Sequence, residues 1–503
     1  MNALTRYILC TLLILSCVAP SQAQVPKKRE FRGVWIHTLN GDYQGKSEQQ
    51  FKTYFNSQLD KLQKAGINAV LFQIRPEADA FYPSTLEPWS RFLTGTQGVS
   101  PGWDPLAFVI TACHAHNMEF HAWINPYRVA LDTIKPLAPT HIYYKHPEWF
   151  VTYGKQMFFN PGIPECRQFI NDVVKDIVSK YDVDAIHMDD YFYPYPIAGK
   201  EFPDEATFEK YGIPSGFAGE KDNWRRSNVN LLIRDIHQTI HETKPWVKFG
   251  ISPFGIYRNK QNALDGIGSN TNGLQCYDQL YADILLWLRN KWIDYAVPQL
   301  YWEIGKKEAD YETLINWWAA YSYERPLFIG QDIVRTVKAP DLQNPAINQM
   351  NRKIELSRLT QNVQGNCYWS GKALLDNPGN ALTELEVKYN KTPAIAPVFD
   401  FIDNKAPKKV RGLKVKWTDA GYLLLWIQPK AKEEMDKATN YVIYRFGMKE
   451  KVNLEDPAHI IAITPDCFYR LPYNDGHTKY RYVITALDRL HNESKSKAKK
   501  IKL

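Results

Sequence analysis

Two adjacent acidic residues end an apolar stretch near the middle of the chain, in the run Asp184-Ala-Ile-His187-Met-Asp189-Asp190-Tyr191. Neighbouring carboxyl groups among aromatic residues have perturbed pKa values, because burial and mutual repulsion both disfavour double ionisation. Side chains of a strand alternate between two faces, so Asp189 shares a face with His187 and Asp190 begins the next loop. Acid–base chemistry is therefore predicted here, with Asp189 as first candidate. The alternative for either aspartate is a structural role, pinning loop amides or binding an ion.

A second acid is needed if this chemistry is glycosidic cleavage, in which one carboxyl group protonates the leaving oxygen and another acts as nucleophile or base. Glu303 directly follows Tyr301 and Trp302 at the end of another apolar run. It is the first candidate for the acid/base, because an aromatic environment would raise its pKa. Asp332, at the end of a later run, is the rival. The alternative for both is a rim residue paired with an arginine.

Amide, guanidinium and aromatic side chains accompany these acids at the ends of the apolar runs. Amides and arginine forks hydrogen-bond sugar hydroxyls, and aromatic faces stack on the apolar faces of sugar rings. Arg75 and Arg128 could also hold Glu77, Asp79 or the catalytic aspartate in place, and any of the aromatic residues could simply fill the core. The predicted substrate-binding residues are Trp35, Gln73, Arg75, Asp79, Asn125, Tyr127, Arg128, Tyr191, Tyr193, Gln299, Tyr301, Trp302, Gln331 and Trp369.

Other chemistries have weaker support in the sequence. His37, His121 and His187 lie on different predicted strands, and no short-range ligand motif supports a metal triad among them. The chain has no Gly-rich phosphate loop, no Gly-x-Ser-x-Gly elbow and no local Cys–His signature. We therefore expect neither a metal nor a cofactor.

A scaffold of alternating strands and helices must position the acids. Eight apolar, β-rich runs alternate with helix-period stretches between residues 33 and 388, which predicts a closed (β/α)8 barrel. Barrels place their chemistry at the carboxyl ends of the strands, where the polar residues above lie. The predicted strands are Gly33–Thr38, Ala69–Arg75, Glu119–Tyr127, Ala185–Tyr193, Lys248–Gly255, Tyr295–Trp302, Pro326–Ile333 and Asn366–Lys372. The predicted helices are Phe51–Ala65, Pro105–His116, Arg167–Lys180, Trp224–Thr243, Leu280–Lys291 and Tyr311–Tyr321, and long loops occupy 81–103, 130–164 and 194–223.

A linker, Thr392–Lys409, leads to a second region whose short alternating strands predict a β-sandwich. Residues 404–503 hold 21 Lys and Arg against 11 Asp and Glu, so the remainder of the chain, whose total net charge is +8, is close to neutral. The barrel is therefore not expected to bind nucleic acid. The lysines between 495 and 502 are interpreted as a solvated edge, or alternatively as a contact for an anionic wall or membrane. The predicted strands are Gly412–Thr418, Gly421–Gln428, Asn440–Phe446, His459–Thr464, Asp466–Tyr469 and Tyr480–Asp488.

The amino terminus has the features of an export signal. An apolar run from Tyr7 to Val18 precedes the small-x-small site Ser21-Gln22-Ala23, which predicts a signal peptide over residues 1–23. The run is too short to span a membrane. Cys17 is the alternative processing site, as a lipid-tethered cysteine. The five cysteines that follow are odd in number and widely spaced, so core packing rather than a disulfide framework is expected to stabilise the fold.

Several longer blocks occur in order along residues 31–390. They are Phe31-Arg-Gly-Val-Trp-Ile36, Asn68-Ala-Val-Leu-Phe-Gln-Ile-Arg-Pro76, His121-Ala-Trp-Ile-Asn-Pro-Tyr-Arg128, His187-Met-Asp-Asp-Tyr-Phe-Tyr-Pro194 and Asp294-Tyr-Ala-Val-Pro-Gln-Leu-Tyr-Trp302. In these blocks the chain resembles the family-ten-like glycosyl hydrolases, an exported bacterial family formerly classed as a domain of unknown function. The resemblance implies a (β/α)8 barrel, often followed by a fibronectin-type-III-like domain. It also implies glycosidic cleavage, in some members within peptidoglycan glycan strands freed of their stem peptides.

The combined prediction is an exported, monomeric glycoside hydrolase of the periplasm, outer membrane or cell surface. Residues 24–391 form the TIM barrel, 392–409 the linker and 410–503 the fibronectin-type-III-like sandwich. Asp189 is nucleophile or base, Glu303 the acid and Asp190 the alternate, and the preferred substrate is peptide-free peptidoglycan, with endo-action implied by the resemblance alone. The alternatives are a non-catalytic wall- or polysaccharide-binding barrel, and a hydrolase of a dietary or capsular polysaccharide.

Overall fold

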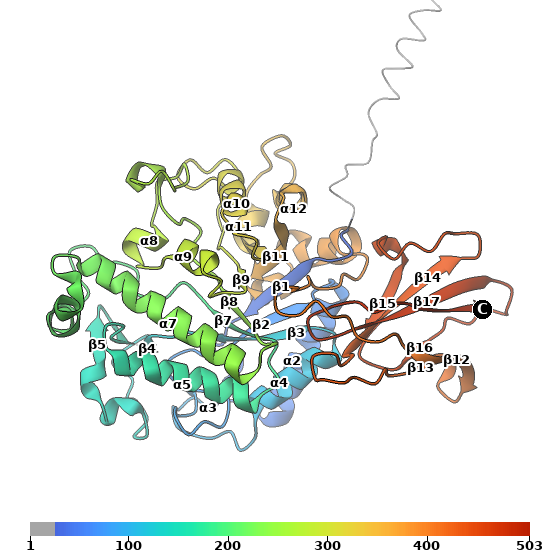
Figure 1. Ribbon diagram of the computed structural model, residues 1–503, viewed down its shortest axis with the longest axis horizontal. Helices are drawn as coiled ribbons and strands as arrows, with labels where there is room; N and C mark the ends of the chain where they lie inside the picture. The colour runs from blue at the N-terminus through green and yellow to red at the C-terminus, as the bar shows by residue number, and fades with distance from the viewer. Residues whose placement is uncertain (1–25) are drawn as a thin grey trace, which may run out of the picture.

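The computed structural model describes residues 26–503, so the predicted signal peptide and the Cys17 tether lie outside the described residues. Eight parallel strands close into a barrel in the order β1-β11-β10-β9-β8-β7-β3-β2 (Figure 1). Every predicted barrel strand overlaps one of them, which confirms the closed barrel. The strands are β1 (Phe31–Ile36), β2 (Ala69–Arg75), β3 (Glu119–Ile124), β7 (Ala185–Met188), β8 (Lys248–Ile251), β9 (Tyr295–Ala296), β10 (Leu327–Asp332) and β11 (Val363–Trp369).

Helices pack around the outside of the barrel. At the start of α2 (Glu48–Lys64), the Ser47 hydroxyl accepts a hydrogen bond from the backbone N–H of Gln50. The side-chain oxygen of Gln50 accepts in turn from the backbone N–H of Ser47, so two amino-terminal donors are satisfied. The periodic apolar residues of α2, such as Phe55 and Leu59, are fully buried. The longer helices are α2 (Glu48–Lys64), α4 (Pro105–Ala115), α5 (Pro164–Lys180), α7 (Lys221–Thr243), α10 (Tyr311–Ala320) and α12 (Met350–Leu359). Shorter ones are α3 (Arg91–Thr94), α6 (Glu205–Thr207), α8 (Cys276–Gln279), α9 (Ile284–Arg289), α11 (Ile333–Lys338), α13 (Gly371–Leu375) and α14 (Ala381–Glu384).

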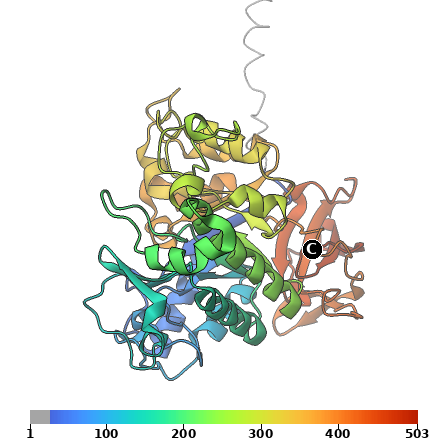
Figure 2. The same cartoon turned by 60° about the vertical axis from the view of Figure 1, so that its left-hand side comes forward.

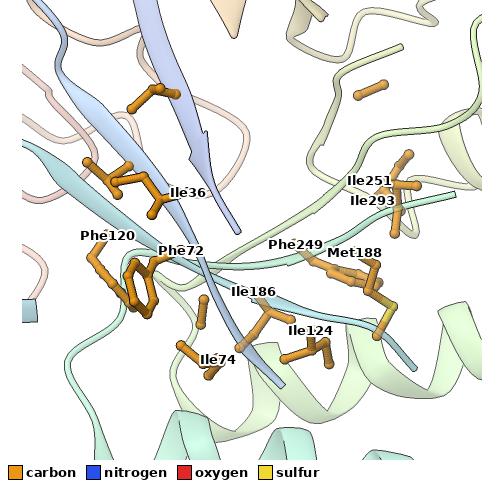
Figure 3. Packing of buried hydrophobic residues seen from close by; sticks show 14 of the residues in the cluster. Ile36, Phe72, Ile74, Phe120, Ile124, Ile186, Met188, Phe249, Ile251 and Ile293 are labelled. Atoms are coloured by element: carbon orange, nitrogen blue, oxygen red, sulfur yellow. The ribbon is translucent and has the colours of Figure 1, made fainter. Parts of the chain in front are cut away.

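Two apolar layers result from the alternation of side chains along the barrel strands. One cluster contains strand residues such as Phe72, Ile186 and Phe249 together with the buried faces of the helices, and Figure 3 shows part of it from close by. A second cluster fills the interior and includes Leu71, Trp123 and Tyr295, among others. Since the interior is packed with side chains, the barrel is a solid support for residues at its ends.

Three strands are anchored at the amino-terminal end of the barrel by the residue that precedes them. The side-chain oxygens of Asn68, Asp184 and Asp294 accept the backbone N–H of Arg32, Phe120 and Phe249, at 2.8, 2.7 and 2.7 Å respectively. Each bond joins the start of one strand to its neighbour. These residues therefore fix the register with which β7 and its neighbours reach the opposite end.

The loops at the carboxyl ends of the strands carry additional structure. The loop after β3 forms a small sheet in the order β4-β6-β5, and the loop after β7 contains α6 and an irregular helical segment, 208–217. The strands are β4 (Arg128–Ala130), β5 (Phe150–Tyr153) and β6 (Gln156–Phe159). The expected long loops at 130–164 and 194–223 are thus partly structured.

Beyond the barrel the chain forms two antiparallel sheets, in the orders β12-β13-β16 and β15-β14-β17-β18. Residues from both sheets, including Leu424 and Ile484, share one apolar cluster. The last strand, β18, was not expected, because its lysines had been interpreted as a solvated edge. The strands are β12 (Arg411–Thr418), β13 (Gly421–Ile427), β14 (Asn440–Gly447), β15 (Ile460–Thr464), β16 (Phe468–Arg470), β17 (Lys479–Leu487) and β18 (Lys497–Lys502).

This all-β region packs against the amino-terminal end of the barrel (Figure 2). Leu490 and Phe399, 1% and 2% exposed, belong to the apolar cluster of the barrel interior. The His491 ring lies 2.8 Å from the carboxylate of Glu119 at the start of β3, and Glu119 also contacts Lys248. The connecting segment is likewise held, since Ile395 exchanges backbone hydrogen bonds with residues next to β1. The segment predicted as a linker is therefore packed over much of its length.

Two further observations concern the described chain as a whole. Across residues 26–503, no helix combines the length and the hydropathy needed to cross a bilayer. The five cysteines in this range are free thiols, of which four are buried, as expected from their spacing. The fold is thus held by packing and hydrogen bonds.

Candidate active site

A cavity of about 370 Å³ opens at the carboxyl-terminal end of the barrel strands. Its walls come from the ends of β1, β3, β7 and β11 and from the segments that follow β7, β8, β9 and β10. Most lining residues are aromatic, and the only carboxyl groups among them are a consecutive pair. The lining residues are Trp35, Trp123, Asp189, Asp190, Tyr191, Tyr195, Ser252, Phe254, Gln299, Tyr301, Trp302, Arg335 and Trp369.

Asp189 is 5% exposed and is surrounded by hydrogen-bond donors. The indole N–H of Trp123 donates to Oδ2 at 3.1 Å, the Asn125 amide donates to both oxygens at 3.1 and 3.2 Å, and the Tyr191 backbone N–H donates to Oδ1 at 3.3 Å. Burial raises the pKa of Asp189, while the nearby Arg128 cation and these donors oppose the rise. All of these groups donate to Asp189, and none of them offers an acceptor for a protonated carboxyl group, so the site suits the charged carboxylate.

Asp190 is 3% exposed and faces a different pair of groups. The Gln299 amide donates to Oδ1 at 2.9 Å, and the Tyr195 hydroxyl makes a short hydrogen bond with Oδ2. Burial and the adjacent Asp189 charge raise the pKa of Asp190 to about 6. Because a tyrosine hydroxyl can donate or accept, Asp190 can carry a proton without leaving Tyr195 unpaired. The two consecutive aspartates are therefore chemically different: Asp189 suits the anion and Asp190 suits the acid.

Three tryptophans lie together beside Asp189. Trp369 contacts Trp35 and Trp123 edge-on, with ring centroids 6.5 and 6.1 Å apart. The Trp35 indole N–H donates to the buried His187 ring at 3.2 Å, which fixes the orientation of the indole. On another part of the wall, Trp302 packs edge-on against Phe254 at 5.4 Å. These rings provide the flat apolar surfaces on which sugars stack.

Eight of the residues singled out from the sequence line this cavity. Trp35, Tyr191, Trp302 and Trp369 were expected as stacking surfaces, and Gln299 reaches both Asp190 and the Ser252 carbonyl at 2.9 Å. The eight are Trp35, Asp189, Asp190, Tyr191, Gln299, Tyr301, Trp302 and Trp369.

Several predicted binding residues instead support the cavity from behind. Asn125 holds Asp189 directly. The Arg128 guanidinium lies 5.4 Å from the Tyr191 ring centre and donates to the Pro76 carbonyl. Arg75 is fully buried, paired with Glu87 at 2.8 Å, and bonded to backbone carbonyls of the loop after β3. These residues position the loop and the carboxylate, a role that the sequence had left open for both arginines.

Other predicted binding residues make contacts away from the cavity. Gln73 bonds the Thr38 backbone, and Gln331 bonds Tyr311 and Asn366. Asp79 accepts from the Glu77 amide and from Gln97 within a buried loop, where burial raises its pKa to about 7. Tyr127 and Tyr193 are buried, and Tyr193 packs between Phe202 and Tyr281. Their positions are those of core residues.

Glu303 and Asp332, the expected partner acids, are not among the lining residues. The Glu303 side chain is 39% exposed and lies 3.7 Å from Lys306. Asp332 caps α11, its carboxylate accepting from the Arg335 amide at 2.9 Å. β9 ends at Ala296, so Glu303 follows an irregular segment in which strand alternation does not apply.

Five lining residues were not predicted. Trp123 shares strand parity with His121 and Asn125, so alternation could have identified it. Tyr195 lies in the aromatic run after Asp190, and it stacks on Tyr191 at 5.2 Å. Ser252, Phe254 and Arg335 were not singled out, because the segment after β8 brings the first two to the cavity and helix α11 brings Arg335.

The described histidines do not form a metal triad at this site. His121 and His187 both hydrogen-bond the Tyr295 hydroxyl in the barrel interior, at 2.7 and 3.1 Å, while His37 stacks on Trp369. At the opposite end, His237, His241 and Asp294 bring potential ligand atoms within 4.8 Å of one another. His241 and Asp294 already bond each other at 3.1 Å and secure β8, which is a structural role.

A second cavity, of about 330 Å³, lies between the barrel and the all-β region. Its acids are already paired: Glu119 with Lys248 and His491, Asp184 with His114, and Asp182 with Arg489. The carboxyl-end cavity therefore has the better arrangement for chemistry, in agreement with the usual location of barrel active sites.

A closed parallel barrel with paired acids at its aromatic carboxyl-end mouth defines a protein of the glycosidase-like barrel class. A family described as glycosyl hydrolase-like 10 matches residues 30–347, and the chain belongs to this family. A curated relative, the glycosyl hydrolase YngK of Bacillus subtilis (strain 168), is 42% identical over 490 residues, covering 95% of this chain and 94% of the relative.

A second curated relative and a solved structure are also similar to this chain. The glycosyl hydrolase DigH of Escherichia coli (strain K12) is 33% identical over 377 residues, covering 69% of this chain and 84% of that protein. Among solved structures, the PgaB (BpsB) glycoside hydrolase domain from Bordetella bronchiseptica is 12% identical with a TM-score of 0.46, covering 72% of this chain and 99% of that one.

Proposed function

We propose that this protein is a glycoside hydrolase that cleaves O-glycosidic bonds of a polysaccharide with Asp189 and Asp190. The observation that carries the proposal is the difference between these two carboxyl groups in one aromatic cavity. Donors and a nearby cation surround Asp189, whereas Asp190 has a hydroxyl partner that can accept a hydrogen bond from the protonated carboxyl group. One anion and one acid are what glycosidic cleavage needs.

In this proposal Asp190 protonates the leaving oxygen and Asp189 stabilises the positive charge that develops at the anomeric carbon. Asp190 takes the role expected of Glu303, because Glu303 is partly exposed and outside the cavity lining. The aromatic walls hold the sugar rings, and Arg335 offers donors to hydroxyls or carboxylates.

The substrate proposed is the peptide-free glycan strand of peptidoglycan. Support comes from the family resemblance, from a cavity of aromatic and amide groups, and from a basic carboxyl-terminal region that suits an anionic wall. The proposed organisation is a signal peptide over 1–23, a catalytic barrel over 24–391, a connecting segment over 392–409 and a fibronectin-type-III-like module over 410–503. Export to the periplasm or cell surface follows from the amino-terminal sequence pattern.

The test is hydrolysis of purified peptide-free glycan strands alongside a panel of α- and β-glucans. Wild type is expected to shorten the strands, and Asp189→Asn and Asp190→Asn are each expected to lower kcat/KM by about 10³-fold or more. The matched control is Glu303→Gln, which is expected to stay within about threefold of wild type because its side chain lies outside the cavity.

The outcomes separate the competing functions. Equal hydrolysis by wild type and Asp189→Asn would refute this site, and a loss confined to Glu303→Gln would restore the sequence-based assignment. Binding of the strands without any product from wild type would favour the non-catalytic barrel. Cleavage of a glucan instead would favour the dietary or capsular alternative.

A further inference from the structure

The carboxyl groups of the proposed active site present a geometric difficulty. Asp189 and Asp190 are consecutive residues at the end of one strand, and no other carboxyl group of the described chain lines the cavity. A glycosidase that uses two protein carboxylates places them on opposite sides of the scissile bond, one for the leaving group and one for the anomeric carbon. Here both acids approach from the end of β7, so the far side of the sugar has no protein nucleophile.

Three tryptophans, Trp35, Trp123 and Trp369, line the cavity together with Asp189, and this part of the cavity is called the tryptophan compartment below. Trp369 contacts each of the other two rings edge-on, and Trp123 also donates its indole N–H to Asp189. The compartment therefore combines apolar ring surfaces with a carboxylate oxygen. A sugar acetamido group has the matching chemistry, because it carries a methyl group at one end and an N–H donor beside it.

A hydroxyl donor is also available in the same cavity. Tyr301 lines the cavity, and within the described residues its hydroxyl makes no hydrogen bond to another group. Elsewhere in the site the Tyr195 hydroxyl is engaged with Asp190. Tyr301 is thus free to donate to a substrate carbonyl oxygen.

We propose that the tryptophan compartment binds the 2-acetamido group of the sugar on the non-reducing side of the cleaved bond, and that this group is the nucleophile. The inference rests on the proposed hydrolase function and names its substrate class, glycans that contain 2-acetamido sugars. Substrate-assisted glycosidases of this kind need only one protein acid and one stabilising carboxylate.

The reaction balances with the residues present. The acetamido carbonyl oxygen attacks the anomeric carbon, the bond to the leaving oxygen breaks, and the Asp190 proton passes to that oxygen. Asp189 accepts the acetamido N–H and stabilises the cyclic oxazolinium ion, and Tyr301 holds the carbonyl oxygen before attack. Water then attacks the anomeric carbon, Asp190 takes its proton, and the ring opens to regenerate the acetamido group with retained configuration.

The probe for this compartment is N-acetylglucosamine-thiazoline, a stable analogue of the oxazolinium ion. We expect it to inhibit strand hydrolysis competitively and to bind wild type in calorimetry. Asp189→Asn is expected to weaken its binding about 100-fold, in line with loss of a charged hydrogen bond, and Trp369→Ala about tenfold. Glu303→Gln, the matched carboxyl control, is expected to bind it like wild type.

A second reagent distinguishes the mechanism from a protein nucleophile. A 2-deoxy-2-fluoro glycoside would form a covalent adduct on Asp189 if that residue attacked the sugar, and mass spectrometry would detect the added mass. We expect no adduct, and NMR of the first-formed product is expected to show retained configuration. An adduct, inverted configuration, or cleavage of polymers without 2-acetamido groups would overturn the inference while leaving the hydrolase proposal intact.

The two proposals fail in different ways. Thiazoline binding that depends on Asp189 and Trp369, without any strand cleavage by wild type, would leave the compartment in place and remove the hydrolase activity. Strand cleavage that the thiazoline does not inhibit would leave the hydrolase proposal in place and overturn the proposed role of the compartment. Circular dichroism of each variant separates both results from misfolding.

Discussion

Asp189 and Asp190 are consecutive residues, but their carboxyl groups differ chemically because each is hydrogen-bonded by a different set of residues. Trp123 and Asn125 reach Asp189 from β3 and the residue after it, while Gln299 reaches Asp190 from the segment after β9 and Tyr195 from the loop that Asp190 itself begins. The sequence predicted the pair and much of the aromatic wall, because polar residues after apolar runs are visible locally. It predicted Asn125 and Gln299 as site residues but not which aspartate each would bond, since that pairing depends on how separate strands and loops meet in space.

The pH dependence of activity tests the assignment of Asp190 as the acid. Burial and the Asp189 charge raise the pKa of Asp190 to about 6, so kcat/KM is expected to fall as the pH rises above about 6 and the proton is lost. Tyr195→Phe removes a donor that stabilises the anion, so the pKa should rise and the alkaline limb should move up by about one pH unit.

The control for this measurement is Tyr144→Phe. Tyr144 lies in the loop after β3, is 56% exposed and bonds only a backbone carbonyl, so its pH profile should match wild type. An alkaline limb that moves down in Tyr195→Phe would contradict the assignment.

At the scale of elements, short strands explain where sequence reasoning succeeded and failed. β7 ends at Met188, so alternation from His187 still places Asp189 correctly one residue later. β9 has only two residues, whereas the eight-residue strand expected there ended at Trp302 and so favoured Glu303 as a residue at a strand end. β18 was missed because only Ile501 of its residues is both apolar and buried, so its pattern is dominated by charge.

A buried ion cluster beside β1 links the start of the barrel to helix α12. Glu30, 2% exposed, pairs with Arg32 at 2.8 Å and with Arg358 of α12 at 2.7 Å. Burial opposes ionisation of Glu30, but the two guanidinium groups outweigh it and hold its pKa at about 2. Glu30→Gln would leave two buried cations unpaired and is expected to lower the free energy of unfolding by about 3–5 kcal/mol at pH 7.

The sign of the pH effect follows from the lowered pKa. The stabilisation is fully present above the unfolded-state pKa near 4.5 and is lost as the pH falls through about 2, so the difference between variant and wild type should shrink at pH 3. Urea unfolding at both pH values measures this. Glu48→Gln, which breaks an exposed pair with Lys52, should change little at either pH, and a similar loss there would argue against the special role of Glu30.

At the scale of the whole molecule, the all-β region packs against the barrel and shares part of its interior apolar cluster. Leu490 and Phe399 enter the interior cluster, and His491 meets Glu119 at the start of β3. The sequence predicted two structural regions joined by a linker over 392–409. In the structure Phe399 and the residues around Ile395 are buried within that segment.

Leu490→Ala tests this coupling. Removing a buried leucine side chain is expected to cost about 2–5 kcal/mol and to lower the midpoint of a single calorimetric transition that includes both regions. Leu342→Ala, at a residue 61% exposed, is the control and should leave the midpoint unchanged. Two separate transitions, with that of the barrel unaffected, would show that the regions fold independently.

The strand β18 lies at the edge of its sheet and pairs only with β17, so one row of its backbone groups is open to solvent. Four of its six residues are lysines, at positions 497, 499, 500 and 502. Another chain that added a strand here would have to bring its own backbone against this row of ammonium groups, and two copies meeting edge to edge would repel each other. We therefore expect the lysines to oppose edge-to-edge aggregation at high protein concentration. This effect should weaken as added salt screens the charges.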